Sequence, residues 1–137
     1  MASLFTKIIN GEIPCHKIAE DERFFAFMDI RPIAAGHVLV VPKDEVDHFF
    51  DMQEADLSGV LLFAKPIVKA IESVVECERV GLMVAGLEVP HAHLHLVPIA
   101  EVGHLSFAHA KPSEDNVLSE LSEKIRVAYQ KVVENVS

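Results

Sequence analysis

Three histidines at alternate positions are the residues of this sequence best suited to chemistry. They are His91, His93 and His95, with Ala92 and Leu94 between them. Successive side chains of a strand point to opposite faces, so on a strand these three imidazoles share one face. If that face is buried, all of their ring nitrogens need hydrogen-bond partners. The pattern therefore favours a functional site.

A polar, solvated strand face is the simplest interpretation of the run, and two functional ones compete with it. Two of the imidazoles and a remote ligand could hold a metal ion, although three same-face positions span ~13 Å and cannot all reach one ion. Alternatively, two flanking imidazoles orient a central nucleophile. Phosphorus chemistry suits this last interpretation, because an imidazole with a pKa near ~6.5 is neutral at pH 7 and can attack an α-phosphorus. The flanking rings would then bind the non-bridging oxygens or fix the tautomer of the nucleophile.

The elements that must position this run are predicted from apolar spacing and turn residues. Strands are expected at 16–19, 24–28, 37–41, 80–84 and 91–97, and helices at 4–10, 54–75 and 113–134, the last with Ser113 as its N-cap. The segment 102–111 is expected to be irregular. Short turns between strands and one long intervening helix predict an α+β fold, an antiparallel sheet with helices on one face. The 137 residues are expected to form a single domain.

Composition excludes several classes of function. The net charge is −9 and no cluster of Lys or Arg is present, so nucleic acid is not an expected partner. No apolar run approaches the ~20 residues of a membrane span, and the first residues do not resemble a signal peptide. We therefore expect a cytoplasmic protein in which Cys15 and Cys77 are reduced. A mononucleotide remains a possible ligand, because backbone amides and histidines can hold a phosphate without a basic surface.

The histidine run, His91–Val97, resembles the His-φ-His-φ-His-φ-φ signature of the histidine triad (HIT) family of nucleotide-binding proteins. Three further blocks are similar to the family and follow its order: Phe5–Pro14, Ala26–Ile30 and Gly36–Lys43. Together the blocks cover residues 4–98, and the helix predicted at 113–134 is an extension beyond them. The sequence looks most like the Hint-type hydrolases, because galactose-1-phosphate uridylyltransferases replace the third histidine of the run.

The resemblance implies a five-stranded sheet that pairs in a homodimer to give ten strands. It implies a hydrolase or transferase that needs no cofactor and cleaves an AMP-type purine nucleotide at the α-phosphate, such as a phosphoramidate or a dinucleotide. His93 would form a covalent nucleotide intermediate, His95 would contact the phosphate and His91 would support His93. His37 would lie behind the triad as a fourth histidine of the catalytic set. Asp29 would accept the ribose hydroxyls, a task that suits a carboxylate.

Five apolar residues fall where the family builds its base pocket. Plain core packing explains each of them about as well as contact with a base. They are Phe5, Ile8, Ile13, Phe27 and Ile30.

The sequence departs from the family in two places. Many bacterial relatives carry a Cys-x-x-Cys zinc pair where this chain has Ser3 and Thr6, so no structural metal is expected. The loop before the triad is short, and Glu88, next to Val89 in the implied substrate site, stands where relatives have a serine. A carboxylate there repels an anionic substrate unless it is protonated or faces a cationic leaving group. Three roles are thus open for Glu88: a general acid, a group that recognises an amine, or simply a solvated loop residue. The departure at Glu88 also leaves an alternative function open, that of a nucleotide-binding regulatory or adaptor protein.

Overall fold

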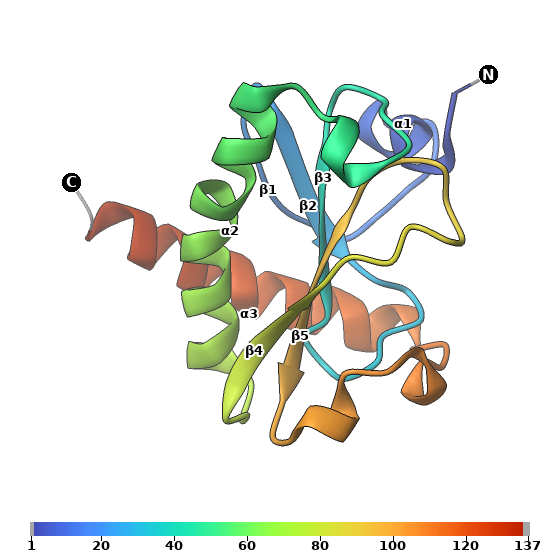
Figure 1. The fold of residues 1–137 in the computed structure, drawn as a ribbon. Coiled ribbons are helices and arrows are strands. Elements are labelled where there is room, and N and C mark those ends of the chain that lie inside the picture. Colours follow the sequence, from blue (N-terminus) through green and yellow to red (C-terminus); the bar gives the residue numbers. More distant parts are fainter. Residues whose placement is uncertain (1, 136–137) are drawn as a thin grey trace.

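Five antiparallel strands form one sheet in the computed structural model of the chain, which describes residues 2–135 (Figure 1). Their order across the sheet is β1-β2-β3-β5-β4. The strands are β1 (Lys17–Glu20), β2 (Phe24–Met28), β3 (Val38–Pro42), β4 (Arg79–Met83) and β5 (Leu94–Ile99). The α-helices are α1 (Leu4–Ile9), α2 (Glu54–Val74) and α3 (Asp115–Glu134), and short 3-10 turns lie at Phe49–Asp51, Val102–His104 and Phe107–His109. The predicted antiparallel α+β architecture is confirmed.

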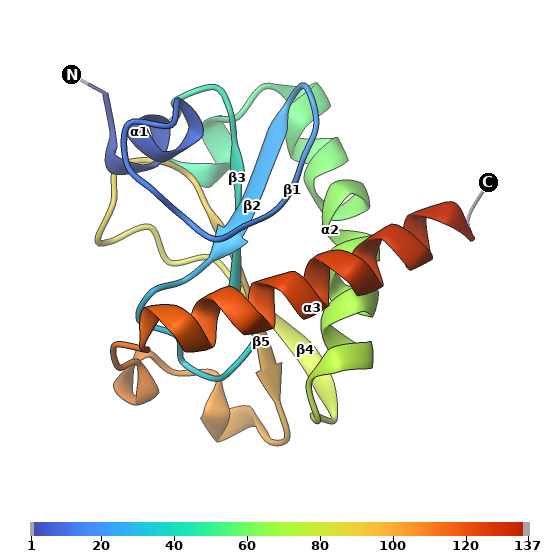
Figure 2. The same cartoon turned by 180° about the vertical axis from the view of Figure 1, so that it is seen from behind.

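The two faces of the sheet are covered by different elements. Figure 2 shows α3 crossing the strands on the face against which α2 also packs. The side chains beneath these helices come from alternate strand positions, including Ala26, Met28, Val38, Val40, Leu94 and Leu96. The intervening side chains, Phe25, Phe27, Leu39 and Val41, form a second cluster with Phe5 of α1. The period-two alternation of the strands therefore supplies two separate apolar clusters from one sheet.

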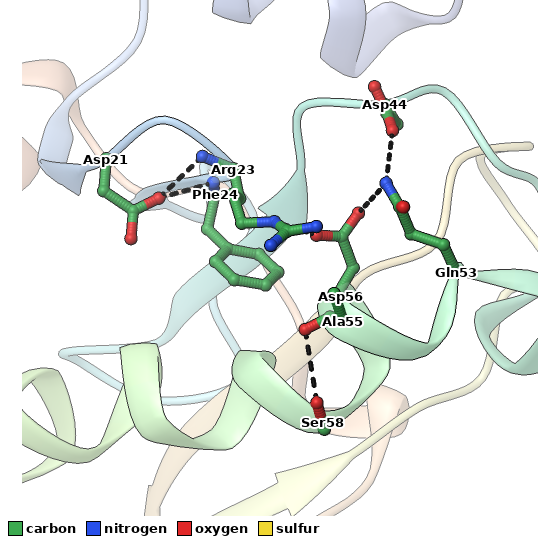
Figure 3. Close-up of polar contacts among 8 residues, drawn as sticks. All are labelled: Asp21, Arg23, Phe24, Asp44, Gln53, Ala55, Asp56 and Ser58. Carbon is green, nitrogen blue, oxygen red and sulfur yellow. Dashed lines mark hydrogen bonds and ion pairs between the residues drawn. The ribbon is translucent and has the colours of Figure 1, made fainter.

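A polar cluster closes one edge of the helix-covered face, where the β1–β2 turn meets the start of α2 (Figure 3). Asp21 Oδ1 accepts from the backbone N–H groups of Arg23 and Phe24, both at 2.8 Å. Arg23 Nε donates to Asp56 Oδ1 at 2.7 Å, and Gln53 Nε2 donates to Asp56 Oδ2 at 3.2 Å. The buried Asp56 carboxylate is thus satisfied on both oxygens, in the first turn of α2 where the helix dipole favours a negative charge.

The strand predicted at 91–97 is shifted along the chain. β5 begins at Leu94, so His91 precedes the sheet ladder, and the amide of Ala92 donates instead to the Val46 carbonyl at 2.6 Å. The strand also continues through Pro98, which the sequence suggested as its end. Pairing of β5 with β3 runs only to Leu96, so Pro98 has a single neighbouring strand and its missing N–H leaves no gap in the ladder.

The C-terminal helix also starts later than predicted. Glu114 rather than Ser113 is the N-cap residue of α3, and the Ser113 amide donates to the Ile30 carbonyl at 3.2 Å. The predicted irregular segment 102–111 contains two of the 3-10 turns. Cys15 and Cys77 are both free thiols. Across residues 2–135, none of the helices combines the length and the apolar character that a membrane crossing requires.

Candidate active site

A cavity of about 370 Å³ opens on the sheet face opposite α2 and α3. All eight residues predicted to bind substrate line it: Phe5, Ile8, Ile13, Phe27, Asp29, Ile30, Glu88 and Val89. His93 and His95 line the same cavity, whereas His91 and His37 are fully buried behind it. The tertiary structure thus brings residues from four separate sequence blocks to one place.

His91 is held at both ring nitrogens. Its Nε2 lies 2.8 Å from the Pro42 carbonyl oxygen, which can only accept, so Nε2 carries the proton. The Nδ1 atom is then free to accept from the Ser3 hydroxyl at 2.7 Å. Burial lowers the pKa of this ring, which keeps it neutral. With both nitrogens used, the His91 ring has no capacity left for a ligand.

His93 presents one nitrogen to the cavity. Its Nδ1 donates to the His91 carbonyl oxygen at 2.7 Å, so the neutral ring carries its lone pair on Nε2. The Phe5 ring packs edge-on against His93 with 5.0 Å between centroids. A backbone carbonyl, rather than a flanking imidazole, therefore fixes the tautomer that exposes a nucleophilic Nε2.

His37 and His95 form a directed hydrogen-bond chain. The Ile33 amide donates to His37 Nδ1 at 3.0 Å, so the proton of His37 is on Nε2 and is donated to His95 Nδ1 at 2.9 Å. The proton of His95 is consequently on Nε2, a buried atom without a hydrogen-bond partner among the described residues. Burial lowers the pKa of His37 to about 3 and that of His95 to about 4, so both rings are neutral at pH 7. The unused N–H donor of His95 suits an acceptor brought by a ligand, such as a phosphate oxygen.

Asp29 lies at the end of β2 with one carboxylate oxygen engaged. Oδ1 accepts from the Arg31 amide at 2.8 Å, and Oδ2 is 3.6 Å from His37 Nε2, too far for a hydrogen bond. Burial, reinforced by the nearby charge of Glu88, raises the pKa of Asp29 against the lowering effects of the Arg31 amide and of the His93 and Arg31 side chains. Oδ2 is thus an available acceptor at the cavity wall.

Asp29, His37 and His95 are close enough together to suggest a metal site, with one ligand atom of each within 4.8 Å of the others. The hydrogen-bond directions argue against it. The Ile33 amide occupies His37 Nδ1, so a neutral His37 must keep its proton on Nε2, the atom that would have to bind the ion. The three groups are better suited to hydrogen bonding.

The apolar wall combines core and accessible residues. Phe5 and Phe27 are buried in the second apolar cluster and form the floor of the cavity. Ile8 and Ile13 are half-buried at its side, and Ile30 is 65% exposed at its rim. Core packing thus accounts for the burial of the two phenylalanines, whereas the isoleucines keep surface available for a ligand.

Residues that the sequence did not single out complete the cavity. Phe107 and Ala110, from the segment after β5, line it together with Arg31. The Phe107 ring packs edge-on against His95 with 5.1 Å between centroids. The sequence signals the role of Phe107 only by its aromatic type, and the segment around it has no periodicity from which to predict where the ring packs. Glu88, by contrast, was singled out, and its exposed side chain lies at the opening.

Comparison with known proteins places the chain among relatives of this architecture. The family model described as HIT domain matches residues 10–102. An uncharacterised HIT-like protein of Methanocaldococcus jannaschii is 40% identical over 102 residues, covering 69% of this chain and 77% of that protein. An adenosine 5'-monophosphoramidase of Schizosaccharomyces pombe is 35% identical over 100 residues, covering 72% and 74% of the two chains.

A zinc-bound histidine triad family protein of Mycobacterium smegmatis has a similar structure, with a TM-score of 0.84, 27% identity and 98% of each chain covered. The residues of the present chain at the positions of the bacterial cysteine pair do not suit zinc. Ser3 and Thr6 offer hydroxyls, which are not preferred zinc ligands, and the Thr6 hydroxyl donates to Glu45 Oε1 at 2.7 Å. His91 Nδ1 is likewise engaged, by Ser3. This part of the structure is a hydrogen-bonded cluster.

Proposed function

Because the chain belongs to the HIT family, we propose that it is a nucleotide hydrolase or transferase that cleaves an AMP-linked substrate at the α-phosphate. The name of the S. pombe relative supports a phosphoramidate as the substrate class. The observation that carries the proposal is the pair of ring nitrogens at the cavity. His93 Nε2 offers a lone pair and His95 Nε2 a proton without a partner, on neighbouring rings whose centroids are 4.8 Å apart.

In the proposed reaction His93 Nε2 attacks the α-phosphorus. A P–N bond forms as the bond to the leaving group breaks, the leaving amine or phosphate departs with the electron pair, and an amine takes up a proton from solvent. Water or another acceptor then attacks phosphorus and releases its proton to solvent, while the P–N bond breaks and the electron pair returns to Nε2. The His93 proton stays on Nδ1 throughout, held by the His91 carbonyl. The N–H of His95 donates to a non-bridging oxygen, where negative charge grows in the transition state.

The remaining groups bind the nucleoside in this proposal. Asp29 Oδ2 accepts the ribose hydroxyls, since its other oxygen is already held by the Arg31 amide. The base lies against the floor made by Phe5 and Phe27, between the isoleucines of the wall. His37 does not touch the substrate. It delivers its proton to His95 and so fixes the tautomer of that ring.

The substitution His93→Ala tests the mechanism. With adenosine phosphoramidate or a dinucleoside polyphosphate, the wild-type protein should release AMP and the variant should not, whereas calorimetry should still detect AMP binding by both. Retention of normal turnover by the variant on every substrate would show that the nucleophile is another group.

We propose a homodimer that extends the sheet across β4. This strand is at the edge of the sheet, and Leu82 on it and Leu61 and Leu62 on the neighbouring α2 are exposed apolar side chains. Light scattering should give twice the chain mass, and Leu82→Lys should shift the population toward the monomer. A wild-type protein that is monomeric at high concentration would contradict this assembly.

One observation favours a second candidate function, a nucleotide-binding regulatory protein with little catalysis. The Glu88 carboxylate at the opening of the cavity opposes the approach of an anionic substrate. AMP binding by calorimetry without turnover on a broad panel of AMP conjugates would favour this function over the hydrolase.

A further inference from the structure

The start of the chain is tied to the triad by a cluster of hydrogen bonds that the proposed chemistry does not use. We name this cluster the N-terminal clasp and define it as Ser3, Thr6, Glu45 and His91. Glu45 Oε1 accepts from the Ser3 amide at 2.6 Å and from the Thr6 hydroxyl at 2.7 Å. These two donors lower the pKa of Glu45, which keeps it ionised. The clasp therefore joins α1 to the segment after β3, 42 residues away in the chain.

Ser3 has three roles in the clasp, and the proton positions separate them. Its amide donates to Glu45, and its Oγ accepts from the Thr6 amide at 3.0 Å as the N-cap of α1. The Thr6 hydroxyl proton is already committed to Glu45, and His91 Nδ1 carries no proton. The Ser3 hydroxyl proton therefore goes to His91 Nδ1, at 2.7 Å, rather than to Thr6 Oγ1, at 3.2 Å. The Thr6 hydroxyl also lies 3.5 Å from His91 Nδ1, but the shortest contacts pair the Ser3 hydroxyl with His91 and the Thr6 hydroxyl with Glu45.

The next bond in the sequence reaches His93. His91 is anchored at one end by Ser3 and at the other by the Pro42 carbonyl, and its own carbonyl accepts from His93 Nδ1 at 2.7 Å. His91 precedes the β5 ladder, and the peptide group that carries this carbonyl is held by one backbone bond outside the sheet, from the Ala92 amide to the Val46 carbonyl at 2.6 Å. The side chain of His91, bound at both ring nitrogens, is a second anchor of the backbone that orients His93.

We propose that Ser3 is a positioning residue for His93, acting through His91. The inference rests on the proposed function, in which His93 Nε2 attacks phosphorus. The hydroxyl of Ser3 holds the His91 ring, the His91 carbonyl holds the proton of His93 Nδ1, and Nε2 keeps its direction into the cavity. Ser3 is buried and does not line the cavity, so it does not touch the substrate.

Three substitutions at Ser3 separate positioning from helix capping. Ser3→Ala loses both the cap and the hydroxyl donor, Ser3→Gly loses the donor while glycine remains an adequate N-cap, and Ser3→Thr keeps both. Positioning predicts that the alanine and glycine variants lose kcat alike, by about ten- to a hundred-fold with little change in KM, and that threonine restores it. Capping alone predicts that the glycine variant retains wild-type kcat.

Nitrogen NMR of the histidine side chains supplies a readout that stability does not move. In the wild type, the ¹⁵N resonance of His91 Nδ1 should have the shift of a hydrogen-bonded acceptor. In Ser3→Gly it should move toward the shift of an imidazole nitrogen without a donor. All assays are made below the melting temperature of each variant, so that only folded protein is compared.

The outcomes distinguish the two proposals. Wild-type turnover together with a Ser3→Gly kcat within twofold of wild type would overturn the positioning role and leave the hydrolase intact. An unchanged His91 Nδ1 resonance in Ser3→Gly would also overturn it. A wild-type protein without turnover on any AMP conjugate would instead overturn the proposed function, and with it the catalytic purpose of the clasp.

Discussion

The two faces of the sheet are built from the same strands and differ in how they use polar groups. On the helix-covered face, the buried Asp56 carboxylate has donors on both oxygens, from Arg23 and Gln53. On the cavity face, His95 Nε2 is buried without a partner among residues 2–135. An unmatched buried donor costs about 1–3 kcal/mol, so such a group is a burden in the free protein that a ligand can relieve. The helix-covered face thus serves stability, whereas the cavity face keeps bonding capacity for a ligand.

The largest expected effect on stability comes from a substitution beneath the helices on the helix-covered face. Ile71 on α2 is fully buried, and Ile71→Ala should lower the free energy of unfolding by about 2–5 kcal/mol through lost burial and a new cavity. Val127 on α3 is 47% exposed, and Val127→Ala should change it by less than about 0.5 kcal/mol. Urea denaturation measures both, and equal losses in the two variants would contradict the assignment of the faces. Turnover of the folded Ile71→Ala variant should match that of the wild type.

A substitution on the cavity face should have the opposite result, a loss of turnover in a protein that stays folded. His95→Ala removes the N–H donor that the proposed reaction directs at the phosphate, and it should lower kcat by about 10²–10³-fold. Thermal melting serves as the control that the variant is folded at the assay temperature. Turnover within threefold of the wild type would mean that the unpartnered nitrogen has no part in stabilising the transition state.

The cavity face should also dominate the pH dependence of stability. The folded-state pKa values of His37 and His95, about 3 and about 4, are below the ordinary value of 6.5. Below about pH 6.5 the unfolded chain therefore binds more protons than the folded chain does. The stability that the two neutral rings contribute is complete above this pH, and it is lost as the pH drops toward their folded-state pKa values. Between pH 6.5 and 5.5 the two rings together should remove about 2 kcal/mol of unfolding free energy.

Urea titrations at these two pH values measure that loss, and His95→Ala should reduce it to about half. A loss of the same size in the variant and the wild type would assign the pH dependence to other groups.

The smallest expected effect concerns the rim of the cavity. Glu88→Gln removes a negative charge from the cavity lining. In the proposed function this change should tighten AMP binding by about two- to fivefold at low salt, with less gain at high salt. Glu101→Gln, at another exposed glutamate, is the matched control and should leave affinity unchanged. Weaker AMP binding by the Glu88 variant would show that this side chain contributes to binding the nucleotide.

Local pattern was sufficient for most of the elements. The bounds of β2 agree with the prediction, α1 and α2 begin where predicted, and β1, β3 and β4 begin within about one residue of it. Apolar periodicity and the breakers Gly and Pro act over only a few residues, so these limits are encoded locally. The start of β5 was wrong by three residues. Strand limits depend on where the partner strands end, and the amide of Ala92 turned to the Val46 carbonyl, a contact that no local pattern encodes.

The candidate site also contains residues that the sequence predicted and residues that it did not. The period of two within the run, together with the family resemblance, predicted His93 and His95 at one cavity with Asp29, and the structure places them there. The contribution of Phe107 was not predictable, since an irregular segment has no period from which to infer what its aromatic ring packs against.

The sequence by itself determined which side chains were available for chemistry and that alternate positions of the strands would form two faces. Only the tertiary structure decided which nitrogen of each ring carries the proton. Ser3 lies 88 residues from His91, and His37 lies 58 residues from His95. A histidine tautomer is set by the donors and acceptors within hydrogen-bond distance of its ring. Those partners meet only when the chain has folded, so the direction of each proton at this site is a property of the fold.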